Sequence, residues 1–115
     1  MCGIVGYIGG QKASPILLSG LMKLEYRGYD SAGIATLEDG TPTVVKHTGR
    51  VRNLYQDPQL DALTGTVGIA HTRWATHGKP SKENSHPHLD SRGVVTVVHN
   101  GIIAKDVDLR SELEL

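Results

Sequence analysis

Short apolar runs separated by glycines and polar residues are the dominant pattern of this 115-residue chain. The first run, residues 3–8, ends at Gly9-Gly10 and predicts a buried strand. Four later runs predict strands over residues 33–38, 43–47, 66–70 and 94–98. The Asp39-Gly40 turn predicts that the strands on either side of it form a hairpin.

Apolar residues at helical spacing predict the remaining elements. The spacing is clearest over residues 15–24, where Ser14 would cap the helix and Pro15 would occupy its first turn. Residues 50–56 predict a short second helix, and residues 108–113 predict a third. The pattern as a whole is typical of a globular chain rich in strands and turns.

Composition limits the classes of function. The chain carries 12 Lys and Arg against 12 Asp and Glu, so its net charge gives no general attraction to nucleic acid or to an anionic membrane. No stretch is long and apolar enough to predict a membrane span, and the N-terminus lacks the features of a secretory signal. One cysteine excludes an internal disulfide. We therefore expect a cytoplasmic chain of at most one domain, with neither nucleic acid nor a membrane as partner.

Cys2, the one cysteine, directly follows the initiator methionine. If Met1 is removed, which the small residue after it permits, a thiol and a free α-amine belong to the same residue. A free thiol titrates at about 8.5 and an α-amine at about 7.7–8.0, so the amine can take the thiol's proton and later return a proton to a leaving amine. The alternative is a small, half-buried residue beside a frayed terminus.

Attack of such a thiolate on an amide carbonyl needs donors for the oxyanion that forms. Asn100-Gly101 follows the last predicted strand and offers an amide side chain and a backbone N–H that can approach closely. Asn-Gly is also a common turn dipeptide, and its spacing alone favours this structural interpretation.

A long polar segment separates the last two predicted strands, and long loops inside compact domains are more often functional than idle. Its first part, Arg73-Trp74-Ala75-Thr76-His77-Gly78, combines a guanidinium, a hydroxyl and an imidazole. Arginine binds a carboxylate through two hydrogen bonds, so Arg73 with Thr76 and His77 could hold the carboxylate of an amino acid. The alternative is a solvated loop arginine with Trp74 packed on the core.

The histidines allow a rival interpretation as a metal site. The residues concerned are His71, His77, His86, His88 and His99. A thiolate-rich zinc site is excluded by the single cysteine, and the HExxH spacing is absent. Phosphate-binding glycine motifs are absent too, so we expect neither a metal nor another cofactor.

Five motifs in order resemble one known family. They are Cys2–Gly6, Leu24–Gly33, His71–Gly78, His86–His88 and His99–Ile103. Together they are similar to the glutaminase domain of the glutamine–fructose-6-phosphate aminotransferases, which are class II glutamine amidotransferases. The resemblance runs from Cys2 to about Ile103 and is specific. It implies an α+β fold, the four-layer αββα sandwich of the N-terminal-nucleophile hydrolases, incomplete in this chain.

The resemblance also implies roles for the residues. Cys2 would attack the side-chain amide of glutamine, release ammonia and form a thioester that water hydrolyses, and Asn100 and Gly101 would form the oxyanion hole. Arg73, Thr76 and His77 would bind the carboxylate end of glutamine, and Trp74 would lie beside the site. In the full enzyme, which is expected to be a homo-oligomer, the ammonia would convert fructose 6-phosphate into glucosamine 6-phosphate.

The chain departs from the family pattern after Ile103, where Ala104-Lys105-Asp106 replaces the usual residues. We expect residues 1–115 to be the N-terminal portion of a longer protein, without the family's later acidic residue for the glutamine amino group and without its sugar isomerase domains. Such a fragment should leave sheet edges and apolar surface uncovered and be poorly active alone. An inactive fragment, a glutamine-binding module and the glutaminase part of a different class II amidotransferase remain as alternatives.

Overall fold

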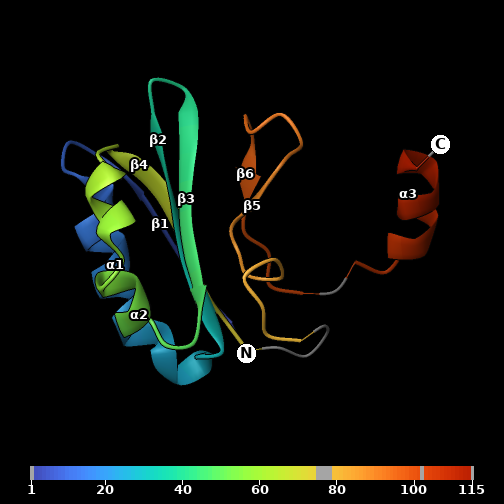
Figure 1. The fold of residues 1–115 in the computed structure, drawn as a ribbon, viewed down its shortest axis with the longest axis horizontal. Helices are drawn as coiled ribbons and strands as arrows, with labels where there is room; N and C mark the ends of the chain where they lie inside the picture. Colours follow the sequence, from blue (N-terminus) through green and yellow to red (C-terminus); the bar gives the residue numbers. More distant parts are fainter. Residues whose placement is uncertain (1, 75–78, 102, 115) are drawn as a thin grey trace.

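The computed structural model describes residues 2–74, 79–101 and 103–114 (Figure 1). Its elements in chain order are β1 (Gly3–Ile8), α1 (Ala13–Leu24), η1 (Glu25–Arg27), β2 (Ser31–Glu38), β3 (Thr41–Thr48), α2 (Arg52–Tyr55), η2 (Pro58–Ala62), β4 (Val67–Arg73), β5 (His88–Leu89), β6 (Thr96–Val97) and α3 (Asp106–Leu113). The mixture of helices with antiparallel strands confirms the α+β class. Within the described ranges, no helix is long and apolar enough to cross a membrane.

Four strands form the main sheet in the order β1-β4-β2-β3, and every neighbouring pair is antiparallel. β4 lies between β1 and β2 and pairs Thr72 with Gly3 on one side and Arg73 with Ser31 on the other. Because β1 starts where β4 ends, Cys2 lies beside the carboxyl end of β4. The sheet register therefore sets the position of the second residue of the chain.

The helices α1 and α2 lie on one face of this sheet (Figure 1). Helix α1 turns Leu17, Leu18 and Leu21 towards the strands, and all three are buried. Full burial of a side chain of this size contributes about 1.5–3 kcal/mol, so this face supplies much of the folding energy. The rest of the core comes from Ala13, Ala32, Ile34, Val45, Val51, Leu54, Leu63 and Ala70.

The start of α1 differs from the expected cap. The helix begins at Ala13, and Ser14 is a buried residue of its first turn. Its hydroxyl donates to the carbonyl oxygen of Leu63 at 3.3 Å, and the Ala13 N–H donates to Gly65 O at 2.9 Å. The prediction that Ser14 caps the helix is wrong, because the loop before β4 takes up these groups instead.

The predicted strand over residues 94–98 is also longer than the observed one. Only Thr96–Val97 is a strand, β6, and it pairs with β5, His88–Leu89, which the sequence did not predict. The carboxylate of Asp90 accepts the N–H groups of Val94 and Val95 at 2.7 and 2.9 Å. These bonds hold the first residues of the apolar run in the turn, so they cannot extend the strand.

The face of the sheet opposite α1 carries the segment Ser85–Pro87 next to β5 (Figure 1). The ammonium group of Lys46, on β3, donates to Ser85 O at 2.7 Å and to Pro87 O at 3.1 Å. On β2, a side chain at Gly33 would overlap His86 O and lie 2.9 Å from Pro87 Cδ. A glycine and a lysine on neighbouring strands thus let this segment lie directly on the sheet.

Apolar surface remains exposed on the described part of the chain, as expected. The strands β1 and β3 form the two edges of the main sheet. Ile8 is 81% exposed and Val95 58% exposed, and the short helix α3 has no buried residue. Figure 1 shows α3 standing apart from the sheet. These surfaces contribute no burial to the fold as it stands.

Replacing Gly33 with alanine should destabilise the protein, because the new methyl group would overlap the backbone of His86. Overpacking of this kind costs about 1–3 kcal/mol in the free energy of unfolding, measured by urea denaturation. Gly6→Ala is the matched control, since a methyl group there meets nothing within 4 Å. Equal stability of the two variants would contradict the close approach of the segment to β2.

Candidate active site

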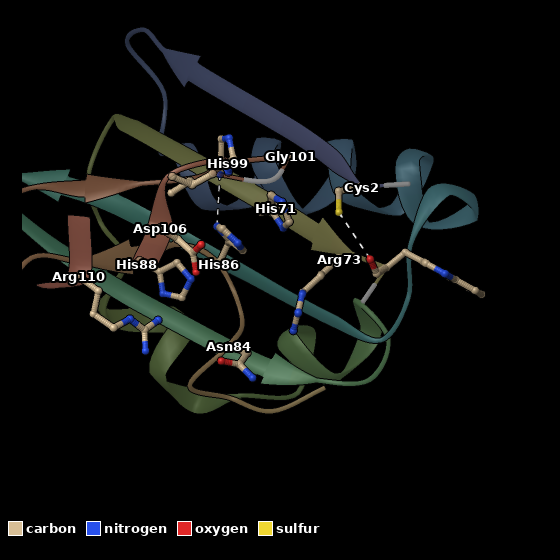
Figure 2. A pocket seen from close by; sticks show the side chains of 12 residues that line it. Cys2, His71, Arg73, Asn84, His86, His88, His99, Gly101, Asp106 and Arg110 are labelled. Carbon is tan, nitrogen blue, oxygen red and sulfur yellow. Dashed lines mark hydrogen bonds between the residues drawn. The ribbon is translucent and has the colours of Figure 1, made fainter. Parts of the chain in front are cut away.

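A pocket of about 710 Å³ opens beside Cys2, between the end of β4 and the chain that follows β6 (Figure 2). Its walls combine residues that are far apart in the sequence. The lining residues are Cys2, His71, Arg73, Trp74, Asn84, His86, His88, His99, Gly101, Ile103, Asp106 and Arg110. The structure therefore brings together residues from four of the five motifs, namely those that begin at Cys2, His71, His86 and His99.

Cys2 is a half-buried free thiol immediately before β1. The hydrogen bonds of β1 to β4 hold the backbone that follows it, so the residue is not on a frayed end. Its Sγ lies 4.0 Å from the carbonyl oxygen of Trp74, a weak contact that keeps the sulfur at the pocket wall (Figure 2). A reactive thiol needs such partial access, and this position provides it.

The alternative interpretation of Arg73 and Trp74 required a solvated arginine in a loop and a tryptophan packed on the core, and the structure shows neither. Arg73 is the last residue of β4 and is 9% exposed, and its Nη1 lies 3.5 Å from Lys79 O. Trp74 is 43% exposed and makes an edge-to-face contact with Tyr29 at 5.0 Å, while the guanidinium of Arg50 lies 4.8 Å from the Tyr29 ring centre. A solvated loop arginine beside a core-packed tryptophan is therefore wrong for this pair.

Of the two residues expected to stabilise the oxyanion, Gly101 lines the pocket and Asn100 is exposed outside the lining. Gly101 has φ 156°, a conformation that favours glycine, and a side chain there would come within 3.2 Å of the His99 ring. Thr76 and His77 fall outside the described residues. The predicted roles of all four residues stay predictions.

On sequence alone, four histidines that line the pocket were considered only as metal ligands and had no other role at the site; they are His71, His86, His88 and His99. The rings of His71 and His86 stack with centres 4.3 Å apart, and His88 meets His86 edge-on at 4.4 Å. The Nδ1 atom of His86 accepts the backbone N–H of His99 at 3.3 Å (Figure 2). Within the described part of the chain, no group of His, Cys, Asp and Glu side chains has a geometry that could hold a metal ion.

Burial keeps these imidazoles neutral. Desolvation lowers the pKa of His71 to about 4 and, together with the neighbouring rings, the pKa of His86 to about 3. The pKa of His88 is lowered for the same main reason, with Lys46 acting in the same direction. At neutral pH the rings of His71, His86 and His88 are therefore uncharged, and they lie in the same pocket as the guanidinium of Arg73.

Known proteins match the sequence and the fold of the chain, although no family model matches it. Over 113 residues, or 98% of the chain, it is 58% identical to the glutamine–fructose-6-phosphate aminotransferase of Caldanaerobacter subterraneus subsp. tengcongensis. The enzyme of the same name from Clostridium tetani is 56% identical over 113 residues, and that from Thermosynechococcus vestitus is 57% identical over 114 residues. The chain matches the N-terminal region of glutamine–fructose-6-phosphate aminotransferase. It spans about a fifth of the length of these aminotransferases, 18–19%.

Two solved structures show the same fold over 99% of the chain. One is the glutamine phosphoribosylpyrophosphate amidotransferase of B. subtilis, with a TM-score of 0.83 and 29% sequence identity. The other is the allosteric regulatory enzyme of purine biosynthesis, with a TM-score of 0.85 and 30% sequence identity. The chain covers 25% of each. It therefore has the N-terminal-nucleophile hydrolase fold of the class II amidotransferases, and the resemblance found in its sequence is confirmed.

The lowered histidine pKa values make the stability of the fold depend on pH. Between pH 6.5 and about 4 the unfolded chain binds protons that buried His71 and half-buried His86 do not bind, so the free energy of unfolding should fall as pH falls through this window. The slope is at most about 1.4 kcal/mol per pH unit for each histidine. Urea denaturation at pH 7, 6 and 5 measures it, and His71→Phe, which cannot titrate, should flatten the curve.

Imidazole nitrogen chemical shifts provide the direct check on the same prediction. The rings of His71 and His86 should remain neutral at pH 5.5, whereas an ordinary histidine is largely protonated there. A titration midpoint near 6.5 for both rings would show that they are not desolvated in solution.

Proposed function

We propose that this chain hydrolyses the side-chain amide of glutamine, with Cys2 as nucleophile, and supplies the ammonia to a second reaction. The single observation that supports this most is the position of the Cys2 thiol at the rim of a pocket that also contains Arg73 and Gly101. A nucleophile, a cation for a carboxylate and a close backbone approach are the parts that an amidotransferase of this fold requires. The match to glutamine–fructose-6-phosphate aminotransferases supports glutamine as the substrate.

The reaction begins when the α-amine of Cys2, freed by removal of Met1, takes the proton of the thiol. The thiolate attacks the amide carbon of glutamine, and the side-chain amide of Asn100 and the backbone N–H of Gly101 stabilise the oxyanion. Breakage of the C–N bond, with the proton returned to the departing nitrogen, releases ammonia and leaves a γ-glutamyl thioester on Sγ. Water then attacks the thioester, so that glutamate leaves and the thiol is restored.

Arg73 binds the α-carboxylate of the substrate in this scheme. Its guanidinium is buried at the end of β4, where the low-dielectric surroundings strengthen its attraction for an anion. Thr76 and His77 complete this carboxylate site, and Trp74 lies beside the site, next to the sulfur. The neighbouring rings of His71 and His86 are neutral, so they do not compete with Arg73 for the carboxylate.

In the complete protein the ammonia converts fructose 6-phosphate into glucosamine 6-phosphate. Residues 1–115 are then the N-terminal portion of a type 2 glutamine amidotransferase domain, and the sugar isomerase domains belong to other parts of the protein. We expect the protein to be cytoplasmic, since a thiol that must remain reduced is suited to a reducing compartment. The resemblance to the aminotransferases also implies that the complete protein is a homo-oligomer. One structural neighbour is named for phosphoribosylpyrophosphate rather than a sugar phosphate of this kind. The identity to the two neighbours, 29–30%, is well below the 58% identity to the aminosugar enzyme, which favours the latter.

Cys2→Ala should lower glutamine hydrolysis in the complete natural protein at least about a thousandfold, because the variant has no atom that can form the thioester. Glutamate release measures the activity. Lys23→Ala is the control, since this exposed residue of α1 lies outside the pocket lining and should keep full activity.

The mass of the intact active protein should show that Met1 is absent, because a peptide bond would remove the basic amine. Full turnover by Cys2→Ala, or by a protein that retains Met1, would end the proposal of an N-terminal cysteine nucleophile.

Asn100→Ala should lower kcat for glutamine hydrolysis by about a hundredfold or more if the side chain donates to the oxyanion, with KM little changed. Steady-state kinetics over a range of glutamine concentrations separate the two constants. An effect on KM alone would instead make Asn100 a residue that positions the bound substrate.

A further inference from the structure

His86 is connected to the sheet and to the oxyanion segment, defined here as His99–Gly101, but it has no role in the reaction proposed above. Its own backbone belongs to the segment Ser85–Pro87, which the ammonium group of Lys46 holds through two carbonyl oxygens. The same segment lies against β2 at Gly33, where no side chain intervenes. His86 is therefore presented from the rigid sheet rather than from a free loop.

Two other histidines, His71 and His88, contact the ring of His86 and limit its orientation. His71, which is 1% exposed on β4, stacks on it with an angle of 27° between the ring planes, and His88 meets it at 62°. These contacts orient the imidazole without giving it a charge, because burial and the neighbouring rings hold its pKa at about 3. The ring thus has a defined orientation and a free lone pair.

That lone pair accepts a hydrogen bond from the oxyanion segment. The backbone N–H of His99 donates to His86 Nδ1 at 3.3 Å, so Nδ1 carries no proton and the ring is the Nε2–H tautomer (Figure 2). The residues bonded in this way are separated by 13 positions in the sequence and belong to no common helix or strand. Gly101, two residues after the bonded N–H, lines the pocket beside Cys2.

We propose that His86 is a positioning residue, whose neutral ring accepts the His99 N–H and thereby fixes where Asn100 and Gly101 present their donors to the oxyanion. This inference rests on the proposed hydrolysis of glutamine. Oxyanion donors must be aligned before the transition state forms, and a displacement of about 1 Å can cost a hundredfold in rate. A chain of contacts from Lys46 through His86 to His99 supplies that alignment from the sheet.

A matched pair of variants in the complete natural protein tests the proposal. His86→Asn keeps an amide oxygen near the place of Nδ1, while His86→Leu fills similar space without an acceptor. We expect His86→Leu to lower kcat for glutamine hydrolysis about tenfold or more, with KM within about threefold, and His86→Asn to keep most of the activity. Equal losses in the two variants would overturn the role of the hydrogen bond.

Alkylation of Cys2 by iodoacetamide separates positioning from a general loss of structure. Alkylation needs the thiolate but forms no oxyanion, so its rate should remain within about twofold of the natural protein in both variants. A parallel fall of alkylation and hydrolysis in His86→Leu would mean that the ring only supports the fold around the thiol, and the proposal would be overturned.

Lys46 provides a second test that does not depend on folding of the His86 variants. Lys46→Met removes the two hydrogen bonds to the segment, whereas Lys46→Arg can still donate to both carbonyls. Hydrolysis should fall in the methionine variant and be largely kept in the arginine variant, again with unchanged alkylation. Equal hydrolysis by the two Lys46 variants would contradict the chain of contacts. These outcomes differ from failure of the proposed function, which would appear as hydrolysis that does not depend on Cys2.

Discussion

The antiparallel pairing of β4 with both β1 and β2 is the interaction on which the rest of the structure depends. Its register places Thr72 opposite Gly3 and Arg73 opposite Ser31, so Cys2 and Arg73 lie at the same end of the sheet, where both line the pocket. Backbone hydrogen bonds define this register residue by residue, and a slip of one position would turn every side chain to the other face. The buried leucines of α1 prevent that slip, because they need the apolar face of these strands. Core packing on one face thus determines the geometry of the pocket.

The opposite face of the sheet is organised by polar groups. Lys46 holds two carbonyl oxygens, Gly33 admits the backbone of the segment, and stacked neutral imidazoles fill the space beside β4. Such an arrangement is less tolerant than an apolar core, since each buried polar group must keep its partner or its uncharged state. This intolerance is useful at a site where groups must be held within a fraction of an ångström. The face that packs against α1 therefore provides stability, and the opposite face aligns the groups of the pocket.

Much of the fold could be predicted from local pattern. The strand over residues 3–8 is observed with those bounds, and the helix of 15–24 and the hairpin around Asp39-Gly40 are present with slightly longer elements. Errors arose where a distant partner decides the outcome: Ser14 bonds to a residue 49 positions away, and the strand of β5 depends on its pairing with β6. The candidate residues Cys2, Arg73, Trp74 and Gly101 could be named from their motifs, and the structure brings them together in the lining of one pocket. The histidine stack could not be foreseen, because spacing along the chain does not show that β4 and the segment after it face each other.

The place of β1 at the edge of the sheet has a practical consequence for anyone who produces this protein. Among the residues that the structure describes, no strand pairs with the outer side of β1, and Cys2 leads directly into it. A purification tag fused ahead of Cys2 would still leave β1 able to pair with β4, so the fold would be retained. It would nevertheless convert the amine of the proposed nucleophile into an amide, so a correctly folded sample would not hydrolyse glutamine by the proposed route.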